Sequence, residues 1–217
     1  NAAETKVTEG GDWKVLVGEA EARIAIDAAR AELATAKAAE DAVAAKAAAL
    51  TALKKALADA AAPGKQIADR EAEINAAEAR VKADGDEWKV LVGEKDATDA
   101  IDEAKAKATA KVTALTNLNE ALATALAPGD GKKIDDREAA IDTAAAEFVG
   151  DGKSLKDEKD ATDAITAAKT KAQEKATALH RLNEALATAL APAPGKQIAE
   201  RGTAITEAET KVTADGE

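Results

Sequence analysis

The sequence contains no cysteine, no methionine and no tyrosine, and its 217 residues include two tryptophans, one phenylalanine and one histidine. Without cysteine the chain cannot form a disulfide framework or carry out thiol redox chemistry. A zinc site would have to rely on carboxylates, an unusual ligand set for that metal. We therefore expect no metal and no cofactor. The lack of methionine even at residue 1 indicates that the chain is processed or is part of a longer protein.

Basic residues are scarce relative to acidic ones. The 30 Lys and Arg stand against 41 Asp and Glu, which gives a net charge of −11. A surface of this sign repels phosphate backbones and anionic lipids, so the main source of nucleic-acid affinity is missing. No stretch approaches the ~18 apolar residues of a membrane span, and no signal-peptide pattern is visible. We expect neither nucleic-acid binding nor membrane insertion.

Alanine dominates what the sequence does contain. It accounts for most of the 46% of residues that are hydrophobic. Burying apolar surface stabilises a fold by ~25 cal/mol per Å², and alanine buries little area, so its burial contributes little stability to the core. It is also the best helix former, closely followed by Glu, Lys, Leu and Arg. The composition predicts an all-α protein of slender, closely packed helices.

The chain repeats itself internally. The phrase EKDATDAI at 94–101 recurs at 158–165, and LNEALATALAP at 118–128 recurs at 182–192. Self-similarity at a fixed period is the sequence signature of repeat architectures. We predict three tandem repeats, at 12–84, 85–149 and 150–217, with residues 1–11 as the end of a preceding repeat.

The two ends of the chain share a phrase. AETKVT occupies residues 3–8 and again residues 208–213, so the chain begins and ends at the same phase of the repeat. This favours a section of a longer array over a subunit that joins identical subunits head to tail. In both cases the expected partner is the protein itself.

Each repeat combines a long Ala-rich helix, a Pro-Gly break and a shorter helix. In the second repeat, apolar residues from Ile101 to Leu126 recur every three or four positions and form one helical stripe. Pro63, Pro128 and Pro192 end the long helices, because proline disfavours helix in the residue before it. The short segments carry apolar residues seven apart, which predicts a packing seam as in antiparallel coiled coils. The predicted seam residues are Ile67, Ile74 and Val81 in the first repeat, Ile134, Ile141 and Phe148 in the second, and Ile198, Ile205 and Val212 in the third.

The unequal lengths of these helices predict how the repeats stack. A long helix of ~35–44 residues spans roughly 50–65 Å, whereas a short one of ~20 residues spans roughly 30 Å. If the short helix runs antiparallel to the long one, it reverses only part of the long helix's length. Each repeat therefore starts further along the axis than the one before it. We therefore predict an all-α fold in which three tandem helical repeats pack as an elongated antiparallel coiled-coil or bundle rod.

Both tryptophans occur in one repeated phrase, DWKVLVGE at 12–19 and EWKVLVGE at 87–94. The phrase fits either a helix or a short extended segment that ends at a glycine. We predict that Trp13 and Trp88, with Leu91, fill the junction between helices, where alanine is too small. The alternative is an exposed aromatic anchor for a partner. In the third repeat the tryptophan is missing, and Ser154 followed by Asp157 predicts a capped helix start.

No residue pattern predicts a catalytic site. Ion pairs along the helix surface, worth a few tenths of a kcal/mol each, are expected among Lys65, Arg70 and Glu71 and among Lys133, Arg137 and Glu138. The single histidine, His180, matches a threonine in the second repeat and is expected to be a surface residue.

Threonines recur every eleven residues, as at Thr166, Thr177 and Thr188. Eleven residues make three helical turns, so these side chains form a row. Over this segment the chain resembles the helical antifreeze proteins of fish, which implies an ice-binding face. The charged Glu174 and Arg181 interrupt the face between the threonines, so ice binding is only a remote alternative function.

The function we predict is structural: a non-enzymatic stalk, surface fibre or filament whose repeats set its length. The alternative is a helical-repeat binding or adhesion module of a surface protein, with a protein or carbohydrate partner. The second and third repeats are nearly identical at core and surface positions alike, which favours the structural role. The outside of a cell or virion is the favoured location.

Overall fold

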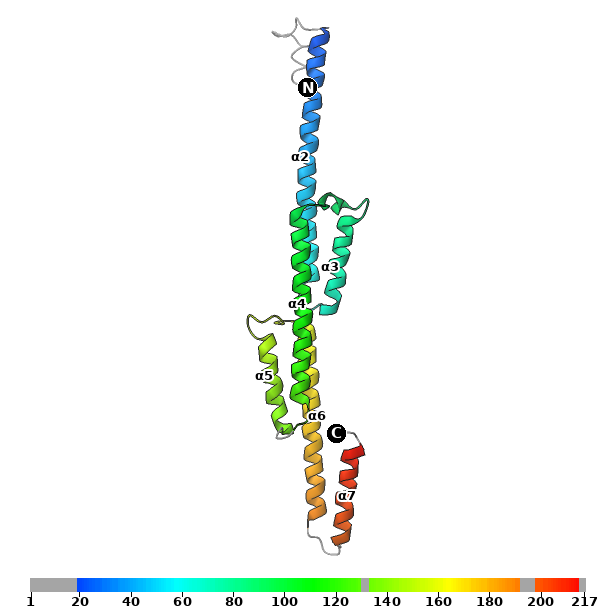
Figure 1. The fold of residues 1–217 in the computed structure, drawn as a ribbon, viewed down its shortest axis with the longest axis vertical. Helices are drawn as coiled ribbons and strands as arrows, with labels where there is room; N and C mark the ends of the chain where they lie inside the picture. The colour runs from blue at the N-terminus through cyan, green and yellow to red at the C-terminus, as the bar shows by residue number, and fades with distance from the viewer. Residues whose placement is uncertain (1–18, 130–132, 192–197, 215–217) are drawn as a thin grey trace. The chain divides into compact units, whose positions relative to one another are not determined.

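The computed structural model describes residues 19–129, 133–191 and 198–214, and every regular element in these ranges is helical. The all-α prediction is thus confirmed for this part of the chain. The elements in Figure 1 are α2 (Ala20–Ala60), α3 (Ile67–Lys82), the 3-10 helix η2 (Glu87–Leu91), α4 (Lys95–Leu126), the 3-10 helix η3 (Ile134–Asp136), α5 (Arg137–Val149), α6 (Lys159–Leu190) and α7 (Ile198–Ala214).

Long and short α-helices alternate along the chain. The long helices α2, α4 and α6 have 41, 32 and 32 residues, and the short helices α3, α5 and α7 have 16, 13 and 17. The helices α2 and α4 end shortly before Pro63 and Pro128, as their prolines predict. Beyond α3 the chain turns at Gly85, which has φ +82°, a backbone conformation that glycine adopts without strain.

The chain divides into two compact units, and α3 and α4 contribute to both. The first unit contains residues 1–59 and 73–104, and the second contains residues 60–72 and 105–217. In the first unit the later part of α2 lies beside α3 and the start of α4 (Figure 1). Its described core is formed by Ala49, Leu53, Leu57, Ile74, Ala77, Val81, Trp88, Leu91, Ala97 and Ile101, all of which are buried.

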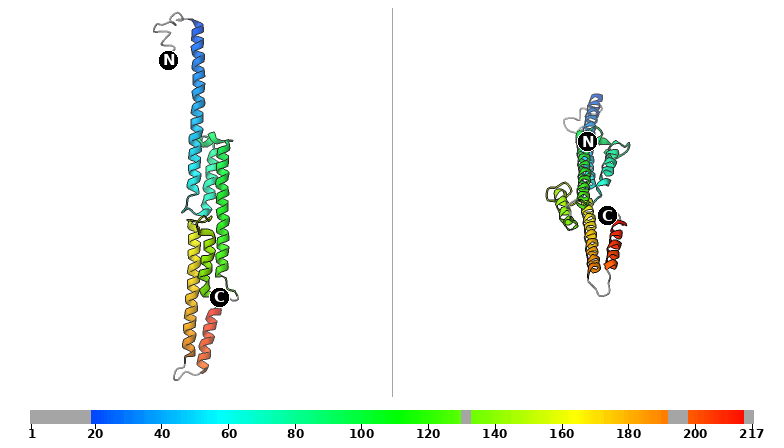
Figure 2. Two further views of the ribbon diagram at one scale, coloured as in Figure 1. Left: turned by 90° about the vertical axis from the view of Figure 1, so that its left-hand side faces the viewer. Right: turned by 60° about the horizontal axis from the view of Figure 1, so that its bottom comes forward.

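The second unit packs the later part of α4 with α5, α6 and α7. Figure 1 and Figure 2 show α5 packed along one side of α4 and α6, and α7 runs beside α6. The buried residues of its core are Ile67, Leu118, Leu122, Ile141, Leu155, Ala161, Ala168 and Ala172. Three of the eight are alanines, which lets the helices approach closely but provides little buried area for stability.

The predicted apolar stripe of α4 is buried in part, since Ala104, Leu115 and Leu126 are only partly buried. Ile101, Ala108, Leu118 and Leu122 are buried, whereas Val112 is 40% exposed. Within the described residues, no helix is both long enough and apolar enough to cross a bilayer.

Candidate functional site

A buried ion cluster lies in the core of the second unit. It consists of Arg70 from α3, Lys111 from α4 and Glu158 at the start of α6. The guanidinium group of Arg70 donates two hydrogen bonds to Glu158, one from Nη1 to Oε1 at 3.0 Å and one from Nη2 to Oε2. Lys111 donates from Nζ to Oε1 of the same carboxylate. The Arg70 and Glu158 side chains are 1% and 0% exposed, so solvent does not screen their pairing.

Arg70 reaches this carboxylate from the packing seam of α3. It follows Ile67 by three residues and precedes Ile74 by four, and all three side chains are buried. Nη2 also donates to the backbone carbonyls of Ala62 and Lys65, at 3.2 Å each. The planar guanidinium group therefore joins a helix, the turn before it and a distant carboxylate in one arrangement.

The electrostatics of the cluster favour an ionised Glu158. Burial alone raises the pKa of this carboxyl group, but hydrogen bonds from Arg70 and Lys111, followed by the attraction of their charges, outweigh it. The pKa of Glu158 consequently lies below its ordinary value. Ion pairs of this kind cost much desolvation, so a buried pair is by itself weak evidence of net stability.

The segment before α6 places the glutamate. Glu158 lies immediately before the helix, and its carbonyl accepts from the Thr162 N–H at 3.1 Å. Asp160 in the first turn accepts from the backbone N–H of Ile67 at 2.6 Å, which ties the starts of α6 and α3 together. The predicted capped start at Ser154 is wrong, because α6 begins at Lys159 and no side chain caps it. Residues 154–157 form turns instead, with Asp157 at φ +62°.

The first unit contains a simpler counterpart. Glu94 precedes α4 as Glu158 precedes α6, and each is followed by the same seven residues. Lys46 of α2 donates to Glu94, as Lys111 donates to Glu158. Among the described residues no arginine pairs with Glu94, and its side chain is 44% exposed.

Trp88 lies in the connection between α3 and α4. The phrase around it is neither an α-helix nor extended; it forms the 3-10 helix η2, whose first turn is capped when Asp86 accepts from the Trp88 N–H at 2.9 Å. The indole is 3% exposed, and the Arg80 guanidinium carbon lies 3.8 Å from its ring centroid. This placement suits the predicted junction role of Trp88 and Leu91, both of which are buried. Trp13 lies outside the described residues.

The predicted seam residues differ in burial from one short helix to the next. Ile67, Ile74 and Val81 on α3 are buried. In the second repeat Ile141 is buried on α5, while Ile134 and Phe148 are partly buried. On α7, Ile198, Ile205 and Val212 are 85%, 37% and 42% exposed.

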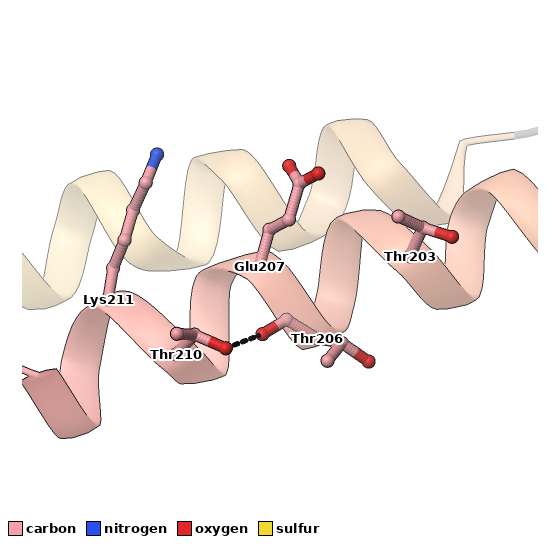
Figure 3. A pocket seen from close by; sticks show the side chains of 5 residues that line it. All are labelled: Thr203, Thr206, Glu207, Thr210 and Lys211. Atoms are coloured by element: carbon pink, nitrogen blue, oxygen red, sulfur yellow. Dashed lines mark hydrogen bonds between the residues drawn. The ribbon is translucent and has the colours of Figure 1, made fainter.

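The surface of the described residues offers little that resembles a binding pocket. A hollow of about 480 Å³ is lined by five side chains that Figure 3 shows: Thr203, Thr206, Glu207, Thr210 and Lys211. All five belong to α7, so no polar groups converge on it from a second element, as they do in typical ligand sites. Within the described ranges, His, Cys, Asp and Glu form no group of three or more that could hold a metal ion. His180 is exposed, as predicted, and lies 3.3 Å from Glu184.

The prediction for Arg70 is wrong, because this arginine forms an interhelical buried pair instead of a surface pair along its own helix. Arg137, at the matching position, is also buried at 6% exposure. A signal was present in the sequence: arginine occurs at the same seam position in all three repeats, at Arg70, Arg137 and Arg201. A charged residue repeated within an apolar seam indicates a buried partner.

Comparison of the chain with protein-family models, with curated proteins and with solved structures found no match in any of the three. The interpretation of this site therefore rests on its own geometry.

Proposed function

We propose that the chain is a structural, non-enzymatic repeat protein that builds a stalk, surface fibre or filament by helix packing and end-to-end continuation. The observation that carries this proposal is the buried ion cluster. Arg70 belongs to the first predicted repeat, Lys111 to the second and Glu158 to the third. A repeat that contacts both the next one and the one after it supports a staggered array of antiparallel helices.

The staggered arrangement also supports a mechanical role. Each buried pair links segments far apart in the sequence, 88 residues for Arg70 and Glu158 and 47 for Lys111 and Glu158. Because neighbouring repeats share such links, the length of the assembly would follow the number of repeats. An extracellular or surface location, and the protein itself as main partner, belong to this proposal.

Small-angle X-ray scattering across a concentration series tests the function. A thin particle with a maximum dimension above about 100 Å at infinite dilution is expected, since α2 alone is about 60 Å long by its helical rise. A compact particle would contradict the structural role.

The alternative, a binding or adhesion module, has one observation in its favour. Ile24, Leu33 and Val43 of α2 are 67%, 65% and 69% exposed, and exposed apolar residues are typical of contact surfaces. A compact particle that stays monomeric would favour this alternative.

A further inference from the structure

Arg137 is a buried arginine that pairs with no carboxylate among the described residues. It is 6% exposed, and its Nε and Nη1 atoms are buried without a hydrogen-bond partner. It occupies the position of Arg70, whose Nη1 donates to Glu158 at 3.0 Å. Nε of Arg70 also lacks a partner, so the difference between the two arginines is at Nη1. Within the part of the chain that the structure describes, no carboxylate reaches Nη1 of Arg137, and leaving a buried guanidinium group unpaired is costly.

The burial of the seam residues indicates that a carboxylate for Arg137 would come from a repeat that follows α7. The seam of α3, which two predicted repeats follow, is buried at Ile67, Ile74 and Val81. The seam of α5, with one repeat after it, is buried in part, and the seam of α7 is exposed. Coverage therefore falls as the number of following repeats falls. A repeat of the same kind, docked after the third, would supply this cover.

The internal pattern identifies the residue that such a repeat presents. Arg70 of the first repeat pairs with the glutamate that begins the long helix of the third. By the same step, Arg137 of the second repeat requires the glutamate of a fourth. Glu19 occupies that position in a repeat, because it follows a glycine, precedes α2 and accepts from the Arg23 N–H at 3.3 Å through its carbonyl. It is exposed.

A second acidic residue near Glu19 supports the same match. Asp160, two residues after Glu158, accepts from the backbone N–H of Ile67. Glu21 stands two residues after Glu19 and is exposed, and Ile134 stands where Ile67 stands before its arginine. A second copy can thus offer both acids, one for the guanidinium group and one for the start of the short helix.

We propose that a second copy of this chain docks on the C-terminal part of the first, with its Glu19 taking the place at Arg137 that Glu158 takes at Arg70. The proposal rests on the proposed function and specifies the contact between successive copies, which we call the joint. The second copy's α2, with exposed Ile24 and Leu33, then covers apolar seam residues of α7. The contact is heterologous, so it repeats from copy to copy and produces a filament.

The test is a charge exchange across the joint, measured by sedimentation velocity over a concentration series. Arg137→Glu and Glu19→Arg should each weaken self-association by more than about tenfold, because each places like charges at a buried contact. Mixing the two variants should restore association, since every joint then again pairs opposite charges. Arg181→Glu and Glu120→Arg, at exposed positions on α6 and α4, are the matched controls.

Circular dichroism of each variant checks that helix content is retained, and the milder Arg137→Gln replaces the reversal if it is not. Restoration by the mixture alone supports the pairing. If the wild-type chain associates but the reversals behave like the controls, the pairing is wrong while the structural role stands. If the wild-type chain stays monomeric at every concentration, the docking is wrong, and the particle's shape at infinite dilution still decides the structural role separately.

Discussion

Glu94 and Glu158 begin the same local sequence, yet they differ in burial and in their ion-pair partners. Both precede a long helix, and both receive a lysine from the preceding long helix. Glu158 also receives Arg70 and is fully buried, whereas Glu94 is 44% exposed. The glutamate that pairs with an arginine from a short helix thus belongs to the core, whereas the one that pairs with a lysine alone lies at the surface.

The largest change in stability should come from removing the arginine that pairs with Glu158. Arg70→Ala leaves Glu158 buried with only Lys111 beside it, and it should lower the free energy of unfolding by about 3–5 kcal/mol. Lys46→Ala, which removes the partner of Glu94, should cost no more than about 1 kcal/mol because that pair is exposed. Urea unfolding followed by circular dichroism measures both. Equal losses would mean that burial does not distinguish the two sites.

Replacing the buried pair by apolar residues sharpens the interpretation. The double variant Arg70→Met with Glu158→Leu removes both charges together, so no unpaired ion stays in the core. We expect its free energy of unfolding to lie within about 1 kcal/mol of the wild type or above it. Lys111, which is 28% exposed, can turn to solvent. A double variant as unstable as Arg70→Ala would show that the pair itself contributes net stability.

Acid should weaken the second unit through Glu158. Its pKa is lowered in the folded state, so its pairing is fully stabilising above the unfolded value of about 4.3 and is lost as the pH falls through the lower folded value. Thermal unfolding between pH 6 and pH 2 should show a steeper fall for the wild type than for Glu158→Gln. Parallel curves for the two proteins would contradict the assignment.

The smallest effect concerns the residue before each glutamate. Gly93 has φ +78°, and the matching Asp157 holds φ +62°, where a residue with a side chain is strained. Asp157→Gly should therefore raise the free energy of unfolding by about 0.5 kcal/mol, after the entropic cost of glycine is subtracted. Gly93→Asp should lower the free energy of unfolding by a similar amount, through the backbone strain at φ +78°. No clash adds to this strain, because a Cβ there meets nothing within 4 Å. Melting temperatures measure both, and a destabilised Asp157→Gly would indicate that the carboxylate has a role of its own.

Much of the local structure could be predicted from the sequence. The ends of the long helices follow from Pro63 and Pro128, and the stripe of α4 follows from its apolar spacing. The 3-10 helix at Glu87–Leu91 could not be predicted, because its phrase fits an α-helix and an extended segment equally well. The capped start at Ser154 failed because the chain keeps Leu155 in the core, with its N–H donating to the Phe148 carbonyl.

By itself the sequence determined the helices, their order and the apolar seams, since propensity, proline and periodicity act over a few residues. It did not determine which carboxylate meets Arg70, because identical octapeptides at 94–101 and 158–165 present equivalent glutamates. Only the tertiary structure decided that choice. Helices with repeated seams can pack in more than one register, and the register is selected by the packing of segments 88 residues apart.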